Sequence, residues 1–352
     1  MKEEIVQKLK NLIQENYLDE KELLLELKKI ITQNEFGEQL DKASVGLSEL
    51  LQNKIQLLEQ DHYANRSIKT GFAELDKLLG GISPGELIVI GGRPGMGKTT
   101  LLANMALNIA PTSNVLYFSF DLSCYSLINR YIAITAGIPT NRLERNDIKE
   151  EEKNLLKKVQ QNLDGLSLFI REDGNISLSL FKAICEKEIA EKKIKVIVID
   201  YLQMMKSHRF KNNRDVEISM IMRELKTMAK EQNVCVLISS QLSRSVETRG
   251  GDKRPYLSDL RESGSIEQDA DKVIFVYRPE YYGLIEDEFG MPTDGIMELI
   301  VAKNRTGMLD TVKFNFDRET GKINEAVPAG DFNFHFSHDR LNELNEDKNE
   351  PF

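Results

Sequence analysis

The chain has 352 residues, of which 29 % are charged and 41 % hydrophobic, a composition typical of globular proteins. Its formal net charge of −9 argues against a protein that coats nucleic acid indiscriminately, but it is compatible with a local basic channel. No hydrophobic run approaches membrane-spanning length, so we expect a cytoplasmic protein with no membrane partner. The three cysteines lack metal-ligand spacing and indicate reduced thiols.

Residues 1–60 show hydrophobic positions at helical spacing and no strand pattern. We expect a small all-helical region that either forms a bundle or docks on a neighbouring subunit. The hydrophobic pattern lapses over 61–69, which we interpret as a linker to a main domain at 70–335. The polar, acidic stretch 336–352 is predicted to be disordered.

Within the main domain, short hydrophobic runs alternate with helical patterns. Strands are expected at 87–90, 115–118, 166–170, 194–200, 234–238, 273–277, 297–301 and 312–316. Helices are expected at 72–79, 101–109, 126–136, 148–163, 177–192 and 216–232. The alternation predicts an α/β fold with a mostly parallel sheet between helices. The closely spaced last strands predict antiparallel additions at one edge.

A glycine-rich turn between the first strand and its helix carries the strongest motif. Gly92, Gly97, Lys98 and Thr99 match G-x-x-x-x-G-K-[ST], which in a strand–loop–helix context indicates a phosphate cradle. Glycines let backbone N–H groups turn toward an anion, and the helix dipole adds positive potential. Lys98 is expected to reach the β- and γ-phosphates of ATP, and Thr99 to ligate magnesium (Mg²⁺). The expected cradle is Gly92, Arg93, Pro94, Gly95, Met96, Gly97, Lys98, Thr99 and Thr100.

Two aspartates follow hydrophobic strands and suit nucleotide hydrolysis. Asp200 ends the run 194–200, where P-loop ATPases place a carboxylate that holds Mg²⁺, and the phosphate loop favours this interpretation. Asp121 ends the run 115–120 and is the best candidate to orient the attacking water. An equally good interpretation makes Asp121 the N-cap of the following helix.

Two basic stretches follow the ends of core strands and are candidates for contacting phosphates of nucleic acid. The first, 206–214, contains Arg209, Lys211 and Arg214. The second, 244–254, contains arginine, glycine and threonine, and both stretches are expected to be flexible. The candidate residues of the second stretch are Arg244, Arg249, Lys253 and Arg254.

Five ordered motifs together resemble the C-terminal ATPase domain of DnaB-type replicative DNA helicases, which have a RecA-like P-loop fold. The resemblance covers about 70–316. It rests on the phosphate loop, on I-D-Y-L-Q at 199–203 and on S-S-Q-L-S-R at 239–244. The most specific motif is D-L-R-E-S-G-S-I-E-Q-D-A-D at 259–271, and the last is A-K-N-R-T-G at 302–307.

The resemblance implies a homo-oligomeric ring, usually a hexamer, that moves along single-stranded DNA by hydrolysing ATP. It makes Gln241 the sensor of the γ-phosphate and makes Lys303 and Arg305 a basic pair that reaches the ATP of the adjacent subunit. Lys303 and Arg305 are expected just past the end of the strand at 297–301. The resemblance further implies 5′ to 3′ unwinding in DNA replication, with a primase or a helicase loader as partner.

The chain departs from the family pattern at two places. Asp121 stands where the family has glutamate, and its side chain is shorter by one methylene group. Residues 1–60 do not match the globular N-terminal domain of the family. Two other functions are therefore kept as alternatives: a RecA/RadA-like DNA-dependent ATPase without unwinding activity, and a slow regulatory ATP-binding assembly protein.

Overall fold

The structure is a computed structural model that describes residues 44, 46–59, 67–174, 176–207, 213–260 and 264–326. The chain divides into two compact units, Met1–Ala64 and Asn65–Phe352. In the first unit, helix α3 (Leu47–Glu59) coincides with part of the predicted helical region and exposes several large hydrophobic side chains to solvent. The remaining predicted helical segments of 1–60 and the acidic tail at 336–352 lie outside the described residues.

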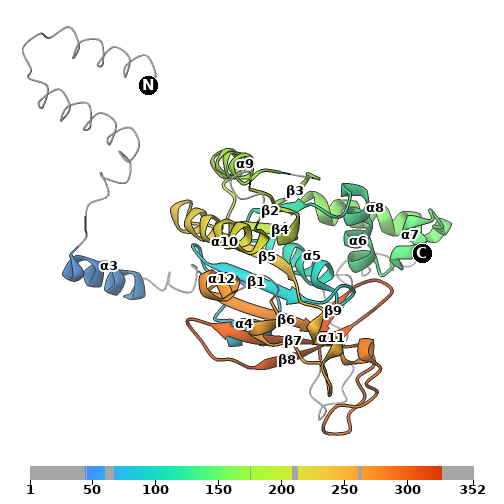
Figure 1. Ribbon diagram of the computed structural model, residues 1–352. Coiled ribbons are helices and arrows are strands. Elements are labelled where there is room, and N and C mark those ends of the chain that lie inside the picture. Colours follow the sequence, from blue (N-terminus) through green and yellow to red (C-terminus); the bar gives the residue numbers. More distant parts are fainter. Residues whose placement is uncertain are drawn as a thin grey trace, which may run out of the picture. The chain divides into compact units, whose positions relative to one another are not determined.

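The second unit is built on one nine-stranded sheet with the order β3-β2-β4-β5-β1-β6-β7-β8-β9. Its strands are β1 (Leu87–Gly92), β2 (Val115–Ser119), β3 (Leu168–Glu172), β4 (Val196–Asp200), β5 (Cys235–Gln241), β6 (Lys272–Tyr277), β7 (Ile296–Asn304), β8 (Thr311–Phe316) and β9 (Ile323–Glu325). The first six strands of this order, from β3 to β6, run parallel to one another. The last three, β7, β8 and β9, pair antiparallel and extend the sheet beyond β6. Figure 1 shows this succession from β3 to β8, which confirms the predicted sheet.

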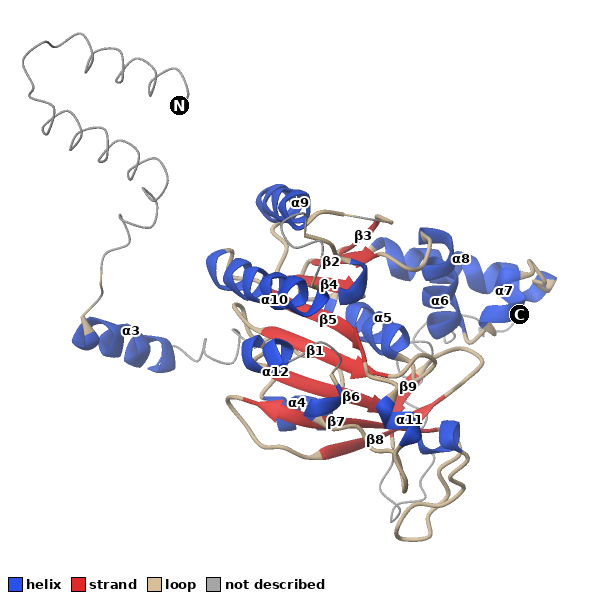
Figure 2. Cartoon of the chain, viewed as in Figure 1, coloured by secondary structure: helices blue, strands red, loops and turns tan. Residues whose placement is uncertain are grey.

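Helices connect the strands and cover the sheet (Figure 2). The longer helices are α4 (Ala73–Leu79), α5 (Lys98–Ile109), α6 (Cys124–Ala136), α8 (Glu150–Asp164), α9 (Leu178–Lys192) and α10 (Arg214–Glu231). Shorter ones, which the sequence pattern did not predict, are α7 (Thr140–Glu144), η2 (Leu202–Met204), α11 (Ser245–Thr248), η3 (Leu257–Asp259), α12 (Gly264–Asp269) and η4 (Pro279–Tyr282). Segments this short lack the two or three turns that a periodic pattern needs.

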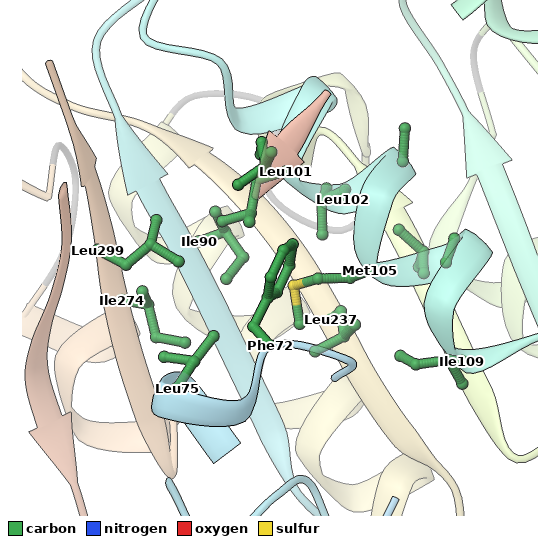
Figure 3. Packing of buried hydrophobic residues seen from close by; sticks show 14 of the residues in the cluster. Phe72, Leu75, Ile90, Leu101, Leu102, Met105, Ile109, Leu237, Ile274 and Leu299 are labelled. Carbon is green, nitrogen blue, oxygen red and sulfur yellow. The ribbon is translucent and has the colours of Figure 1, made fainter. Parts of the chain in front are cut away.

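The alternation of side chains along the strands divides the core into two clusters. In β1, Ile88 and Ile90 pack in one cluster with residues of α4, α5 and α6, whereas Leu87 and Val89 pack in the other with α9, α10 and α12. Figure 3 shows part of the first cluster, in which Phe72 before α4 lies near side chains of α5. All six residues of β1 are buried, as expected for a central strand of a sheet covered on both faces.

The starts and the ends of the parallel strands lie on opposite sides of the sheet, and each side is named by the strand termini that it holds. β1, β2, β4, β5 and β6 all end at one edge, which we call the carboxyl edge. β7 runs in the opposite direction, so that its last residue, Asn304, lies beside Lys272 at the other edge, the amino edge. Ligands of open α/β sheets bind outside the carboxyl ends of the parallel strands, which directs attention to the first of these edges.

Candidate functional site

The phosphate loop connects β1 to α5 at the carboxyl edge. Gly95 and Gly97 have φ angles of 80° and 98°, which side chains with a Cβ rarely adopt. A Cβ at Gly97 would lie 2.9 Å from Met297 Cε, and one at Gly92 would lie 3.2 Å from Lys98 Cγ. The loop therefore has both the backbone conformation and the close packing of a cradle that only glycine can form, which fits a bound phosphate chain.

Lys98, the first residue of α5, points its ammonium group back into the loop. Its Nζ donates a hydrogen bond to Arg93 O at 3.1 Å. Burial lowers the pKa of Lys98 to about 8, and the nearby carboxylates of Asp200 and Asp121 only partly counteract this effect. The ammonium therefore lies in a site where an anion would be bound tightly because little water competes for it.

The two threonines after Lys98 have different surroundings. Thr99 is partly exposed, as a ligand of a metal-bound nucleotide must be. Thr100 is buried, and its Oγ1 accepts a hydrogen bond from Arg130 Nη1 at 2.6 Å. Arg130 Nε is buried without a partner. Arg130 was not predicted, because it is 30 residues away in the sequence and no motif marks it.

Asp200 is held at the end of β4 between two neighbouring strands. Its Oδ1 accepts a hydrogen bond from Ser239 Oγ of β5 at 2.5 Å, and its Oδ2 accepts one from Tyr117 of β2 at 3.1 Å. The residue is 3 % exposed, yet it lies close enough to Lys98 to favour the charged ammonium. Each carboxylate oxygen keeps a second lone pair, so that a water-bridged Mg²⁺ is compatible with both hydrogen bonds.

Asp121 does not cap the helix that follows it. The N-cap of α6 is Ser123, whose hydroxyl accepts the backbone N–H of Ser126 at 3.1 Å. The capping interpretation of Asp121 is therefore wrong. Asp121 is exposed at the end of β2, where it contributes a negative potential at Lys98. This position leaves its carboxylate available at the carboxyl edge.

Gln241 is the last residue of β5 and pairs in register with Gly92 of β1. Its backbone N–H donates to Oε1 of Gln203 at 3.3 Å, and Gln203 Nε2 donates to Ser240 Oγ at 3.1 Å. Gln203 belongs to η2, directly after the Asp200 strand. The segment that follows β4 is thus joined to the end of β5 next to the phosphate loop.

Lys303 and Arg305 lie at the amino edge of the sheet. β7 extends to Asn304, so the prediction that Lys303 follows the strand is wrong; it lies within the strand, opposite Val273, where a bulge interrupts the ladder. Lys303 Nζ donates to the C-terminal carbonyls of α12, and burial lowers its pKa. Arg305 donates to Gln268 O at 2.7 Å and lies 3.5 Å from Asp271 Oδ1, with 47 % of its side chain exposed.

The second basic stretch is more ordered than predicted, because its arginines are paired with buried carboxylates. Arg249 forms an ion pair with Asp259, and Arg254 Nη2 lies 2.6 Å from Glu298 Oε2. Both carboxylate side chains are at most 3 % exposed. The expectation of a flexible loop is wrong for this stretch, which contains α11 and is joined by two ion pairs to carboxylates outside it.

The other candidate residues for DNA contact differ in their surroundings. Arg244 is exposed before α11, and the Lys253 ammonium lies 5.2 Å from the ring centroid of Tyr282. Arg214 begins α10 and forms an ion pair with Glu217 at 2.5 Å. Arg209 and Lys211 lie outside the described residues.

The described part of the chain contains neither a membrane-spanning helix nor a cluster of metal-binding side chains. No helix within it is long and apolar enough to cross a membrane. None of its clusters of histidine, cysteine, aspartate or glutamate brings together three side chains that could hold a metal ion. Mg²⁺ that is bound through one or two protein groups and nucleotide phosphates needs no such cluster.

Comparison with known proteins identifies the second unit. The family model described as DnaB-like helicase C terminal domain matches residues 67–325. The replicative DNA helicase DnaB of Geobacillus stearothermophilus is 38 % identical over 274 residues, which are 77 % of this chain and 59 % of that protein. The replicative DNA helicase DnaC of Bacillus subtilis (strain 168) is 39 % identical over 259 residues, which are 73 % of this chain.

The chain spans 59 % and 56 % of the lengths of these two relatives. A solved structure of a DnaB-like replicative helicase, described with its interactions with primase, superposes with a TM-score of 0.71 at 30 % identity. That match covers 92 % of this chain and 75 % of the other. The fold is therefore the RecA-like α/β fold of these ATPase domains, and the chain belongs to the family defined by the DnaB-like helicase C-terminal domain.

Proposed function

We propose that this protein is an ATP-dependent DNA helicase of the DnaB type. It couples ATP hydrolysis to movement along single-stranded DNA and to unwinding of duplex DNA in the 5′ to 3′ direction during replication. Both relatives compared above are named replicative DNA helicases, which supports this function over the two alternatives.

In this proposal the carboxyl edge binds ATP. Backbone N–H groups of 92–100 surround the phosphates, and Lys98 neutralises the β- and γ-phosphates. Thr99 and Asp200 would hold Mg²⁺, which neutralises charge on the phosphate oxygens when it is bound. Asp121 orients the attacking water, and Gln241 contacts the γ-phosphate. Arg93 contributes its main chain only, since its guanidinium is directed elsewhere.

One observation carries the proposal of a shared active site: Arg305 lies at the amino edge of its own sheet, opposite the carboxyl edge that holds the phosphate loop. The backbone N–H of Arg305 donates to Asp271 O, and the N–H of Asp271 donates to Leu87 O at the start of β1. The phosphate loop follows Gly92, five residues further along β1, which is about 16 Å at 3.3 Å per residue. An arginine side chain spans less than this distance, which supports the proposal that Lys303 and Arg305 reach the nucleotide of a neighbouring copy.

A homo-oligomeric ring, which we propose to be a hexamer, supplies such a neighbour to every subunit. A guanidinium from the next copy would neutralise charge that develops on the γ-phosphate, so that hydrolysis depends on assembly. Single-stranded DNA would bind to Arg209, Lys211, Arg214, Arg244, Arg249, Lys253 and Arg254. One solved relative is described with its interactions with primase, and we propose a primase or a loader as a further partner of this chain.

The test measures ATP hydrolysis with and without single-stranded DNA, together with unwinding of forked duplexes. We expect DNA to stimulate hydrolysis and forks with a free 5′ tail to be unwound, and Lys98→Ala to abolish both activities. Stimulated hydrolysis without unwinding would favour the RecA/RadA-like alternative. Slow hydrolysis whose rate is the same with and without DNA would favour the regulatory ATP-binding protein.

A further inference from the structure

The guanidinium of Arg93 leaves the phosphate loop and joins it to another segment. Its Nε and Nη2 contact Glu247 Oε1 at 2.8 and 2.7 Å, and its Nη1 donates to Leu242 O at 2.7 Å. The side chain of Arg93 is 7 % exposed and that of Glu247 is 41 % exposed. A buried guanidinium with three contacts is fixed in direction, and it would carry an unpaired charge if Glu247 moved away.

Glu247 lies between the proposed γ-phosphate sensor, Gln241, and Arg249, one of the proposed DNA-binding arginines. It belongs to α11, six residues after Gln241 and two residues before Arg249. Leu242, which accepts the other hydrogen bond of Arg93, follows Gln241 directly and donates its own N–H to Gly92 O at 3.4 Å. Arg93 therefore bonds to both ends of the short connection between β5 and α11.

A second set of contacts joins the same two segments. A Cβ at Gly95 of the phosphate loop would lie 3.0 Å from the ring of Tyr281, which forms an edge contact with Tyr282 at 5.5 Å between centroids. The ring of Tyr282 in turn carries the ammonium of Lys253 at 5.2 Å. The tyrosine pair of η4 thus extends from the phosphate loop to the basic stretch, independently of Arg93.

We propose that Glu247 is a positioning residue that transmits the state of the phosphate loop to the basic stretch 244–254 through its ion pair with Arg93. This proposal rests on the proposed function, because it assumes that ATP binds at the loop and DNA at the basic stretch. A change in the loop that moves Arg93 must move α11, since separating the pair would leave a buried charge without its partner. In this proposal Glu247 acts through Arg93 and contacts neither ATP nor DNA itself.

The test compares Glu247→Gln with Asp252→Asn in the full chain. Gln keeps the size of the side chain but removes the charge that holds Arg93. Asp252 is the matched control: it lies in the same stretch and pairs with Arg254 at 3.1 Å, but within the described residues it has no hydrogen bond or ion pair with the phosphate loop. Each variant is assayed for ATP turnover with and without oligothymidylate and for thermal stability.

We expect Glu247→Gln to retain the basal turnover of the wild type. The ratio of its turnover with DNA to its turnover without DNA should be at least about fivefold smaller than in the wild type, which is the lower end of typical coupling between two sites. Asp252→Asn should keep its stimulation, and Glu247→Asp should restore part of it, because Asp keeps the charge. Equal stimulation in Glu247→Gln and the wild type would overturn the proposal. So would an equal loss in both Glu247→Gln and Asp252→Asn, which would indicate general loosening of the stretch.

A folding defect is recognised by a second measurement, the affinity of each variant for oligothymidylate with and without a non-hydrolysable ATP analogue. The wild type should bind DNA with different affinity in the two states, and Glu247→Gln should bind equally in both. A variant that is merely less stable would keep the difference below its melting temperature, and this result would contradict the link. A wild type without any DNA stimulation contradicts the proposed function itself, which distinguishes the two failures.

Discussion

At the scale of single residues, we expect the side chain of Lys98 to take up a proton when a phosphate group binds. Burial holds its pKa at about 8 in the free protein, so that near this pH half of the molecules carry a neutral amine. A bound triphosphate favours the charged form and raises the pKa. The complex then holds more protons than the free protein above pH 8, and we expect ATP affinity to fall as the pH rises through 8.

Calorimetry of ATP binding in buffers of different ionisation enthalpy measures this proton uptake directly. Lys98→Arg is the matched control, because a guanidinium stays charged over the whole range and should bind ATP without taking up a proton. Proton uptake that persists in Lys98→Arg would assign the effect to another group.

Asp121 can now be tested without the helix cap as a competing explanation. As the water-orienting carboxylate, Asp121→Asn should bind ATP with unchanged affinity but hydrolyse it at least about 100-fold more slowly. Asp121→Glu, which restores the side chain of the family, should retain or raise the rate. Single-turnover hydrolysis and nucleotide-binding measurements separate the two effects.

The control for Asp121 is the true cap of α6. Ser123→Ala should lower the free energy of unfolding by about 1 kcal/mol and leave turnover unchanged, because its hydroxyl accepts the N–H of Ser126. If Asp121→Asn behaved like Ser123→Ala, the carboxylate would have a structural role only.

The same residues show what the sequence can predict. The phosphate loop follows β1 and Asp200 ends β4, and the hydrophobic pattern predicts both strands, whose ends the parallel topology brings together. The role of Gln241 at the end of β5 comes from the family resemblance alone. Asp121 and Ser123 are both good N-caps, and propensity alone does not choose between them. Arg130 and Glu247 were missed because their contacts, to Thr100 and Arg93, span 30 and 154 residues of sequence.

At the scale of elements, the basic stretch shows how ion pairs turn a loop into an ordered segment. Its composition of arginine, glycine and threonine predicts flexibility. The sequence pattern does not reveal that Asp259 and Glu298, which lie outside the stretch, pair with its arginines. The placement of Lys303 was missed for a related reason: the bulge opposite Val273 lets β7 continue to Asn304. The local sequence pattern predicts where a helix or strand begins, but it does not predict ion pairs or bulges that depend on residues distant in the sequence.

The ion pairs separate structural arginines from exposed cations in the basic stretch. Arg254→Ala should lower the free energy of unfolding by about 1–3 kcal/mol, because it removes the partner of buried Glu298. Lys253→Ala should leave stability nearly unchanged and weaken single-stranded DNA binding similarly for all sequences, with a smaller salt dependence. Chemical denaturation and DNA titrations at several salt concentrations measure both effects.

The effect of Arg254→Ala should depend on pH. Burial already raises the pKa of Glu298 above its ordinary value, and loss of Arg254 raises it further. A carboxyl group with a raised pKa in the folded state costs stability as the pH rises through that pKa. The difference in stability between the wild type and Arg254→Ala should therefore be larger at pH 8 than at pH 5, and a constant difference would indicate that Glu298 is not involved.

At the scale of the whole molecule, the proposed function assigns complementary halves of one catalytic site to the two edges of the sheet. The carboxyl edge presents Lys98, Asp121, Asp200 and Gln241, whereas the amino edge presents Lys303 and Arg305 against α12. The basic pair is already oriented by carbonyl groups of α12 and by Asp271. A neighbour that docks its carboxyl edge on this surface would meet two positioned cations, so that assembly would complete the site with little further ordering.

This arrangement predicts complementation between two inactive proteins. Arg305→Ala should bind ATP normally but hydrolyse it poorly, and Lys98→Ala should neither bind tightly nor hydrolyse. When the two are mixed under conditions of proven subunit exchange, some interfaces combine an intact Lys98 with an intact Arg305, and turnover should rise above that of either protein alone. The control is a mixture of Lys98→Ala with the double variant Lys98→Ala/Arg305→Ala, which forms no intact site and should stay inactive. A dilution series of the wild type completes the test: turnover per subunit should fall as the assembly dissociates, and constant turnover down to proven monomer would show that one chain holds the complete site.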